Sequence, residues 1–283
     1  MIRSPAAGVP RGSAAIAALA TRLTDRDRRI AMHCYEHRVL TTEQLRRLHF
    51  RAARTARERL QELRELRVLA SFRPPHPRRA GSSPNHWVLA EAGALVVAAE
   101  LGVERTELRW QPAAALAIAS SSKLNHQLAV NEFFTRLSEE ARCAGGVLDP
   151  WWDERRAASL LDRIISPDGY ARLKLPGAQA VELLVELDRA TEDHERLREK
   201  ARRYAKALER SDLDNPLLLL LVPNPGRTER AQAALSATPL RAALWTPERG
   251  PSPLALVRNT TRTGLAAPTP ARPRRKESHG ETE

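Results

Sequence analysis

Acidic residues gather near the middle of the chain, close to a basic residue. The motif Pro167-Asp168-Gly169 is followed by Val185-Glu186-Leu187-Asp188, and Lys200 comes a little later. Carboxylates on neighbouring strand ends, with a cation nearby, are what a metal-dependent site for phosphodiester cleavage needs. This spacing makes such a site the first candidate for the chemistry of the protein.

The strand that carries Glu186 places several acids on one face. Alternation along a strand puts Glu182, Glu186 and Asp188 on one side and the apolar residues at 181, 183, 185 and 187 on the other, toward a core. Acids on such a strand are costly unless they are solvated, paired or bound to a cation. A hairpin turn around Pro176-Gly177 would bring Asp168 beside Glu186.

Two interpretations of these acids remain open. Two or three carboxylates at one strand end would suit Mg²⁺, which takes few protein ligands and keeps several waters. Alternatively, the acids form a structural network with Arg172, Arg189 and Lys200.

The elements around these acids form a segment over residues 123–247. The pattern predicts, in order, a helix over 126–142, strands over 147–152, 164–173 and 180–188, a helix over 191–209, a strand over 217–222, a helix over 228–237 and a strand over 242–246. This order predicts an α/β sandwich with a mixed sheet.

An earlier segment, residues 25–102, has a different order of predicted helices and strands. Helices are expected over 25–37, 42–49, 52–66 and 92–101, with strands over 67–72 and 86–89 before the last helix. Helices followed by a β-ribbon are the layout of a winged helix-turn-helix domain. In that layout the second helix of the pair enters the major groove of DNA.

Arginines are concentrated on that second helix and on the tip of the ribbon. Arginine suits both guanine edges and phosphates. The candidate DNA-binding residues are Arg51, Arg54, Thr55, Arg57 and Arg59 on the helix, and Arg73, Arg78 and Arg79 on the ribbon. The alternative is a solvated charged helix with pairs such as Arg54 and Glu58.

Composition agrees with a nucleic-acid partner. The chain has 283 residues, with 46 Lys and Arg against 34 Asp and Glu, for a formal net charge of +12. Its two cysteines form no motif, and no membrane span is visible, so we expect a cytoplasmic protein without a membrane partner. Residues 1–24 are expected to be a disordered lead-in, 103–122 a linker and 248–283 a disordered, basic, Pro-rich tail.

As a set, the motifs resemble the replication-relaxation family of actinobacterial plasmid and mobile-element proteins. The stretches that carry the resemblance are Ser166-Pro167-Asp168-Gly169-Tyr170, Val185-Glu186-Leu187-Asp188-Arg189-Ala190-Thr191-Glu192 and Glu199-Lys200-Ala201-Arg202-Arg203-Tyr204, with His126, Asn131 and Glu132 on the helix before them. The resemblance covers about residues 25–246. It implies a winged helix joined to a PD-(D/E)xK nuclease-like domain of αβββαβ order, that is, an α/β (α+β) fold.

The resemblance also implies a role in plasmid replication and DNA relaxation. Active PD-(D/E)xK enzymes carry a lysine two residues after the strand glutamate, and here that position is Asp188. Lys200 could replace it from the following helix. In that case Asp168 and Glu186 would hold the metal, Asp188 could assist, and Glu132 could join from the first helix.

The leading interpretation is a DNA-binding replication or relaxation protein of a plasmid or mobile element. One alternative is an active Mg²⁺-dependent DNA endonuclease that uses Asp168, Glu186 and Lys200, and whether the chain is an enzyme stays open. Another alternative is a winged-helix transcriptional regulator. Double-stranded DNA is the expected partner, and other plasmid replication or mobilisation proteins and a homodimer are kept open.

Overall fold

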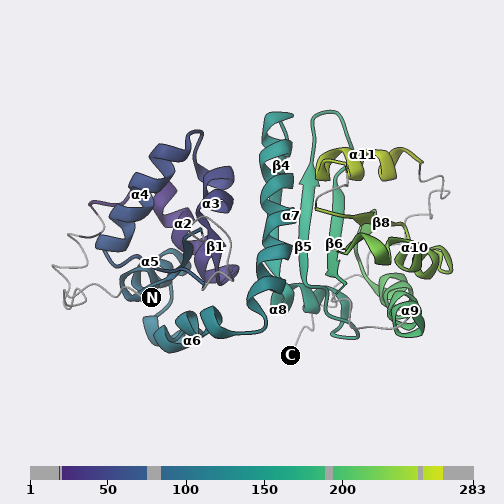
Figure 1. The fold of residues 1–283 in the computed structure, drawn as a ribbon, viewed down its shortest axis with the longest axis horizontal. Coiled ribbons are helices and arrows are strands. Elements are labelled where there is room, and N and C mark those ends of the chain that lie inside the picture. Colours follow the sequence, from purple (N-terminus) through teal and green to yellow (C-terminus); the bar gives the residue numbers. More distant parts are fainter. Residues whose placement is uncertain are drawn as a thin grey trace, which may run out of the picture.

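The structure, a computed structural model, describes residues 19, 21–74, 84–188, 194–222, 224–247 and 251–263. It holds a small antiparallel sheet in the N-terminal part and a mixed five-stranded sheet in the rest. Helix α7 (Leu124–Cys143) stands between the two parts (Figure 1). The α/β (α+β) fold class expected from the sequence is therefore confirmed.

The N-terminal unit comprises residues 25–101. Its elements are α2 (Asp25–Glu36), β1 (Leu40–Thr41), α3 (Thr42–His49), α4 (Ala53–Glu65), β2 (Leu69–Phe72), β3 (His86–Leu89) and α5 (Glu91–Leu101). Strand β3 lies between β1 and β2 and is antiparallel to both. The expected helices and ribbon strands are all present, and β1 is an addition that sequence periodicity did not predict.

Threonine side chains start the first two helices of this unit. Thr24 accepts a hydrogen bond from the backbone N of Asp27, whose carboxylate accepts one in return from the backbone N of Thr24. Thr41 and Gln44 form the same reciprocal arrangement at the start of α3. Each capping box satisfies backbone donors that a helix start leaves without an intrahelical partner.

The C-terminal unit comprises residues 124–263. Its elements are α7, β4 (Val147–Asp153), α8 (Glu154–Ala157), η3 (Ala158–Leu161), β5 (Gly169–Lys174), β6 (Val181–Leu187), α9 (His194–Arg210), β7 (Pro216–Leu221), η4 (Pro225–Arg227), α10 (Thr228–Ser236), β8 (Ala242–Trp245) and α11 (Pro253–Thr263). The expected order of helices and strands is confirmed.

Two expectations about this unit were wrong. The strand expected over 164–173 begins only at Gly169, after the short helical segment of α8 and η3. Residues 253–263 were assigned to a disordered tail, but they form α11, which buries Leu254 and Val257 against the rest of the unit. The apolar residues of α11 fill a space beside α7 and β8 that the local sequence does not reveal.

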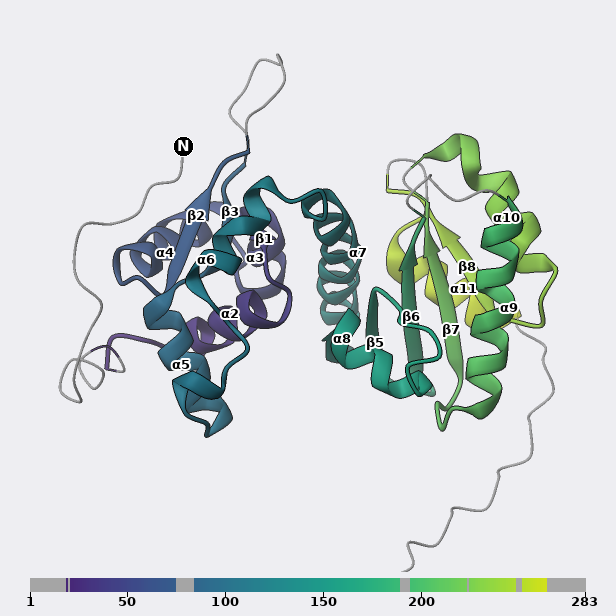
Figure 2. The same ribbon diagram turned by 90° about the horizontal axis from the view of Figure 1, so that it is seen from below.

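The five strands lie in the order β4-β5-β6-β7-β8, with antiparallel pairing up to β6 and parallel pairing from β6 to β8. Helices α7 and α11 cover one face of this sheet, and α9 and α10 cover the other (Figure 2). Alternation along β6 follows the prediction: Leu183 and Val185 pack in the core beneath α7, and Leu184 packs in the core beneath α9. Consequently the face of β6 that holds its acids lies under α9.

The N-terminal unit is fixed to α7 through α3 and the segment before β1. The buried Asn131 of α7 donates from Nδ2 to the backbone oxygens of Val39, at 2.7 Å, and His37, at 3.2 Å. Arg142 of α7 donates to the backbone oxygen of Arg47 at 2.7 Å. Both ribbon views place α3 between α4 and α7, so α4 lies on the side of the unit away from the large sheet (Figures 1 and 2).

The remaining regions connect or flank the two units. The segment expected as a linker, residues 103–122, contains η1 (Arg105–Glu107), α6 (Pro112–Ala117) and η2 (Ile118–Ser120). The expected lead-in, apart from residues 19 and 21–24, and the tail beyond residue 263 lie outside the described residues.

Candidate functional site

The hairpin of β5 and β6 brings Asp168 beside Glu186, as the turn at Pro176-Gly177 indicated. Gly169 pairs with Val185 in the antiparallel register, so Asp168 and Glu186 are next to each other at the carboxyl end of β6. Asp168 Oδ2 accepts a hydrogen bond of 2.8 Å from the backbone N of Leu187. Since β6 supplies this donor, the position of the Asp168 carboxylate is set by the strand itself.

His126, near the start of α7, is the second partner of Asp168. Its Nε2 lies 2.9 Å from Asp168 Oδ1, and both side chains are largely buried. The other ring nitrogen, Nδ1, is buried without a hydrogen-bond partner among the described residues. Helix α7 is thereby tied to the acidic end of the sheet.

Glu186 is bound from α9. Lys200 Nζ lies 2.5 Å from Glu186 Oε1, and the Tyr204 hydroxyl donates to Glu186 Oε2 at 2.6 Å. Lys200 and Tyr204 are four residues apart, which places them one above the other on the same face of a helix. The structure therefore brings Asp168, Glu186 and Lys200 together, as the candidate site requires.

Burial controls the charge of this cluster. The pKa of Glu186 is raised from 4.5 to about 7, first because burial disfavours its charged form and then because the charge of Asp168 lies close by. Lys200 and Tyr204 act in the opposite direction and favour the carboxylate. Burial, together with the charge of Glu186, raises the pKa of the Tyr204 hydroxyl well above its usual value, so this group stays a hydrogen-bond donor at neutral pH.

Asp188 has a different cation. Arg227 of η4 binds it with both arms of the guanidinium, from Nε to Oδ2 at 2.6 Å and from an amino nitrogen to Oδ1 at 3.1 Å. This bidentate geometry is the strong form of a carboxylate–arginine contact. The resemblance leads one to expect a lysine at position 188. The residue there is Asp188, and its carboxylate is bound by Arg227.

Glu182, the remaining acid on this face of β6, is also partnered. The Tyr170 hydroxyl donates to it at 2.8 Å, and the backbone N of Asp214 donates to it at 2.5 Å. Arg172 stands opposite Glu182 in the register, but its Nε is buried with no hydrogen-bond partner among the described residues. Of the cations expected in a structural network, Lys200 is therefore the one seen bound to an acid, and Arg189 lies outside the described residues.

The structure does not bring Glu132, the third candidate metal ligand, together with Asp168 and Glu186. The Glu132 carboxylate is held by Arg47 of α3, at 2.8 Å, and by Arg136 on its own helix, at 2.6 Å. Six residues separate it from His126, about 120° around the axis of an α-helix. Glu132 therefore fastens the N-terminal unit to α7, on a different side of that helix from Asp168.

Asp168 and Glu186 remain as the carboxylates that could bind a divalent cation. Mg²⁺ is often held by one or two carboxylates together with waters, so this pair fits in donor type and number. Nevertheless, each of the four carboxylate oxygens already contacts a protein donor. Within the described part of the chain, no group of three or more His, Cys, Asp or Glu residues could hold a metal ion.

Helix α4 carries the second set of candidate residues. Arg51, Arg54, Thr55 and Arg57 are exposed at its beginning. Arg54 forms the expected pair with Glu58, at 2.8 Å, but its side chain is 87% exposed and its charge remains accessible. No ion pair with a described residue involves Arg51 or Arg57.

Arg59, the remaining DNA-binding candidate of α4, is engaged within the N-terminal unit. Its guanidinium binds both carboxylate oxygens of the fully buried Asp27, at 3.0 and 2.6 Å, and also contacts Glu62. Burial acts most strongly on the pKa of the Asp27 carboxyl and raises it, but the contacts of Asp27 with Arg59 and Thr24 together hold this pKa below its usual value. Arg59 therefore joins α4 to α2 inside the unit.

The ribbon offers one described candidate. Arg73 is exposed and donates from Nε to the side-chain oxygen of Asn85 at 2.6 Å, across the two ends of the ribbon. Arg78 and Arg79 lie outside the described residues.

Comparison with known proteins decides the family. A family model described as replication-relaxation matches residues 32–217, roughly two thirds of the chain. The chain belongs to the replication-relaxation family. No curated protein and no solved structure matches it.

The matched range of this replication-relaxation protein runs from α2 into β7 and contains both sets of candidate residues. Membership indicates a role in the replication of plasmids or mobile elements. Helix α11 lies beyond the matched range. The described helices include none that is long and apolar enough to cross a membrane.

Several residues of this replication-relaxation protein have roles that the sequence did not predict. Tyr204 and His126 both bind acids of the candidate site, a role that the sequence motifs did not assign to them. The spacing of four residues between Lys200 and Tyr204 could have indicated that Tyr204 lies beside Lys200 at the candidate site. Arg227 carries no such signal, because it contacts Asp188 from 39 residues away.

Proposed function

We propose that this protein binds duplex DNA through α4 of a winged helix, and that this contact underlies its role in plasmid or mobile-element replication. The observation that carries the proposal is the exposure of Arg51, Arg54 and Arg57 around the start of α4, a helix that lies on the side of the unit away from α7. A recognition helix contacts base edges with its N-terminal residues, which is where these arginines lie.

The arginines of α3 are used differently and support the choice of α4. Arg46 and Arg47 form ion pairs with Glu139 and Glu132 of α7, at 2.9 and 2.8 Å. Contacts with α7 therefore occupy the charges of α3. The helix on the outer side of the unit keeps its charges for a partner.

The order of elements is also that of a winged helix. Helices α2, α3 and α4 are followed by the ribbon of β2 and β3, and Arg73 stands at the start of the loop that joins them. A helix in the major groove and a basic ribbon beside it would contact neighbouring stretches of one duplex. The net charge of +12 adds attraction to phosphate that does not depend on sequence.

The test is binding of a fluorescent duplex by the full chain, measured by anisotropy at fixed salt. Arg54→Ala combined with Arg57→Ala should weaken binding at least tenfold, as expected for the loss of two charged contacts of about 1 kcal/mol or more each. The matched control removes two exposed arginines from the C-terminal unit, Arg202 and Arg230. Equal affinity of both double variants and the wild type would contradict the proposal.

A second function, metal-dependent cleavage of DNA, is favoured by one contact. Lys200 Nζ lies 2.5 Å from Glu186 Oε1, and Asp168 is next to Glu186, so an acid pair and a lysine meet at one strand end. Asp168 and Glu186 would hold the cation, which would stabilise charge on the phosphate. Lys200 would supply a proton donor or a positive charge beside them.

Nicking of supercoiled plasmid with and without Mg²⁺ tests this second function. Metal-dependent nicking should occur with the wild type, be lost in Asp168→Asn, and persist in Glu182→Gln. Glu182 is the matched control because it is a buried acid on the same face of β6 with partners of its own, Tyr170 and the backbone of Asp214. No nicking by the wild type at high protein concentration would reject the cleavage function and leave the DNA-binding proposal intact.

A further inference from the structure

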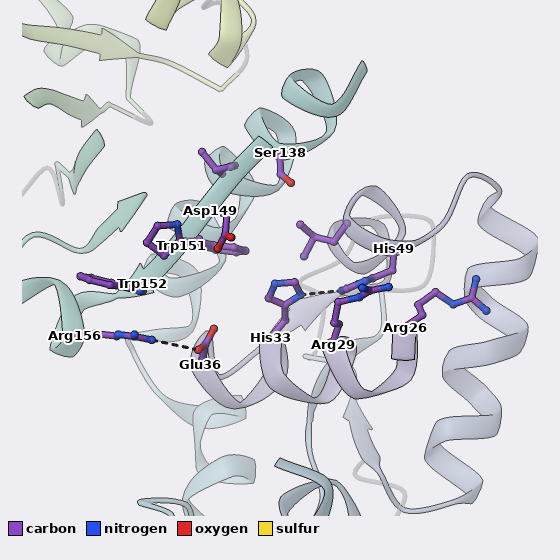
Figure 3. A pocket seen from close by; sticks show the side chains of 13 residues that line it. Arg26, Arg29, His33, Glu36, His49, Ser138, Asp149, Trp151, Trp152 and Arg156 are labelled. Carbon is purple, nitrogen blue, oxygen red and sulfur yellow. Dashed lines mark hydrogen bonds and ion pairs between the residues drawn. The ribbon is translucent and has the colours of Figure 1, made fainter. Parts of the chain in front are cut away.

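A cleft of about 490 Å³ lies where the N-terminal unit meets the beginning of the large sheet. Helix α2 forms one wall, and residues 148–152 of β4 with Arg156 of α8 form the other (Figure 3). Its size is within the range of small-molecule sites in proteins. Neither the acidic cluster nor α4 belongs to it.

One stripe of α2 supplies the charge of this cleft. Arg26, Arg29, His33 and Glu36 follow one another at spacings of three and four residues, so they line a single face of the helix. The guanidinium of Arg26 lies 4.6 Å from the centre of the Phe50 ring, and no described residue forms an ion pair with Arg26 or Arg29. These two positive charges line the same cleft, and neither has a neutralising ion-pair partner in the described part of the chain.

The histidines of the cleft do not add to this charge at neutral pH. Nδ1 of His33 lies 2.9 Å from Nε2 of His49, where one ring donates to the other. Burial lowers the pKa of His33 to about 4 and that of His49 to about 2, assisted by the charges of neighbouring residues. The cations that face a ligand are therefore arginines, which suit bidentate contacts to phosphate.

The other end of the cleft offers a flat surface. The guanidinium of Arg156 lies over the Trp152 ring at 4.4 Å, and the Arg156 side chain is 60% exposed. An arginine plane layered on an aromatic ring is a surface on which nucleobases stack. The indole Nε1 of Trp152 is buried and lacks a hydrogen-bond partner among the described residues.

The acids of the cleft lie toward this flat end. Figure 3 shows Glu36 and Asp149 on the side of Trp152 and Arg156, with Arg26 and Arg29 toward the opposite side. Carboxylates accept hydrogen bonds from the amino groups of bases and repel phosphate. The arginine end of the cleft therefore suits an anionic group of a ligand, and the end with the acids and Arg156 suits a nucleobase.

We infer that this cleft binds a nucleoside monophosphate, with the phosphate at Arg26 and Arg29 and the base stacked on the guanidinium plane of Arg156, which lies over Trp152. The ligand is either a free nucleotide or one unit of a DNA single strand, which share this chemistry. This site is separate from the duplex contact of α4, and it would let one chain hold a duplex and an unpaired nucleotide at the same time.

Calorimetric titration of the full chain with 2′-deoxyadenosine 5′-monophosphate tests the inference. Saturable binding is expected, with weaker binding of 2′-deoxyadenosine and of inorganic phosphate, because each of these fills only one end. Arg29→Ala and Arg156→Ala should each weaken nucleotide binding about tenfold, the loss of one contact to a charged or stacked group. Arg155→Ala, an exposed neighbour of Arg156 outside the cleft, is the matched control and should bind normally.

Single-stranded oligodeoxyadenylate of eight nucleotides distinguishes the two sources. If it competes with the mononucleotide and binds more tightly, a DNA strand is the ligand; if only the mononucleotide binds, a free nucleotide is the ligand. Failure of both to bind would overturn the inference, as would phosphate binding as tightly as the nucleotide. The double variant Arg54→Ala, Arg57→Ala should keep its nucleotide affinity. The nucleotide inference and the duplex-binding proposal can therefore be contradicted separately.

Discussion

Helix α4 and strand β6 both carry several charged side chains, but those at the start of α4 are exposed and those of β6 are buried and paired. At the start of α4 the arginines project into solvent, and Arg54 keeps a side chain that is 87% exposed. On β6 and just after its end, the acids Glu182, Glu186 and Asp188 are buried, and each has a donor from another element. The contrast teaches that exposed charge is available to a partner, whereas buried charge is first of all committed to the fold.

The same contrast occurs within α4 itself. Arg54 and Arg59 are five residues apart on one helix, yet Arg59 is only 20% exposed and binds the buried Asp27. Residue type and local position do not decide between these roles. What decides is whether a third element, here α2, presents a carboxylate to the guanidinium.

The largest effect expected is on stability, from breaking the inner pair of α4. Arg59→Ala should lower the free energy of unfolding by about 3 kcal/mol or more, because it leaves the buried Asp27 carboxylate without its cation. Arg54→Ala should change it by less than about 0.5 kcal/mol, since exposed pairs contribute little. Urea unfolding followed by circular dichroism measures both, and equal losses would contradict the distinction between inner and outer arginines.

The next effect concerns Glu186 and pH. Its pKa is raised from 4.5 to about 7 in the folded protein, so the protonated form is favoured by folding. Stability from this group is fully present below pH of about 4.5 and is lost as the pH rises through about 7, by up to about 3 kcal/mol in total. Wild-type stability relative to Glu186→Gln should therefore fall across this window.

The control for that titration is Glu182→Gln. It removes another buried acid from the same face of β6 but leaves Glu186 in place, so the fall in stability between pH of about 4.5 and about 7 should remain. A constant difference between the wild type and Glu186→Gln across the window would show that burial does not set the charge of the cluster.

A smaller effect is expected from a single hydroxyl. Tyr204→Phe removes the donor that lies 2.6 Å from Glu186 Oε2 and should cost about 1 to 2 kcal/mol of stability. Arg57→Ala on α4 removes a donor to the backbone oxygen of Ala53, but on an exposed surface where water replaces it, and should cost less than about 0.5 kcal/mol. If urea unfolding gave similar losses of stability for Tyr204→Phe and Arg57→Ala, the distinction between buried and exposed polar groups would be contradicted.

The sequence predicted the elements better than the partners. Alternation along β6 and the turn at Pro176-Gly177 were enough to place Asp168 beside Glu186, because hairpin register is a local property. The helix expected over 42–49 is α3, and its start is likewise set locally, by a capping box contained within the four residues from Thr41 to Gln44.

Contacts between distant elements were not predictable in this way. Asp27 and Arg59 are 32 residues apart, Asp188 and Arg227 are 39 apart, and Glu132 meets α3 through a docking of the two units. Each pairing depends on tertiary packing, which periodicity does not encode. The helix α11 was not predicted for the same reason, because its apolar residues are buried through packing against α7 and β8, which are distant in sequence or not evident from local periodicity.

The most direct test of the central claim is the salt dependence of duplex binding. Each lysine or arginine that contacts a phosphate contributes about 0.9 to the slope of the logarithm of affinity against the logarithm of salt concentration. The double variant Arg54→Ala, Arg57→Ala should bind more weakly and lose about 0.9 of this slope for each of the two arginines that contacts a phosphate. The Arg202→Ala, Arg230→Ala control should keep both affinity and slope. If the α4 variant keeps the affinity and the slope of the wild type, α4 is not the DNA-binding surface.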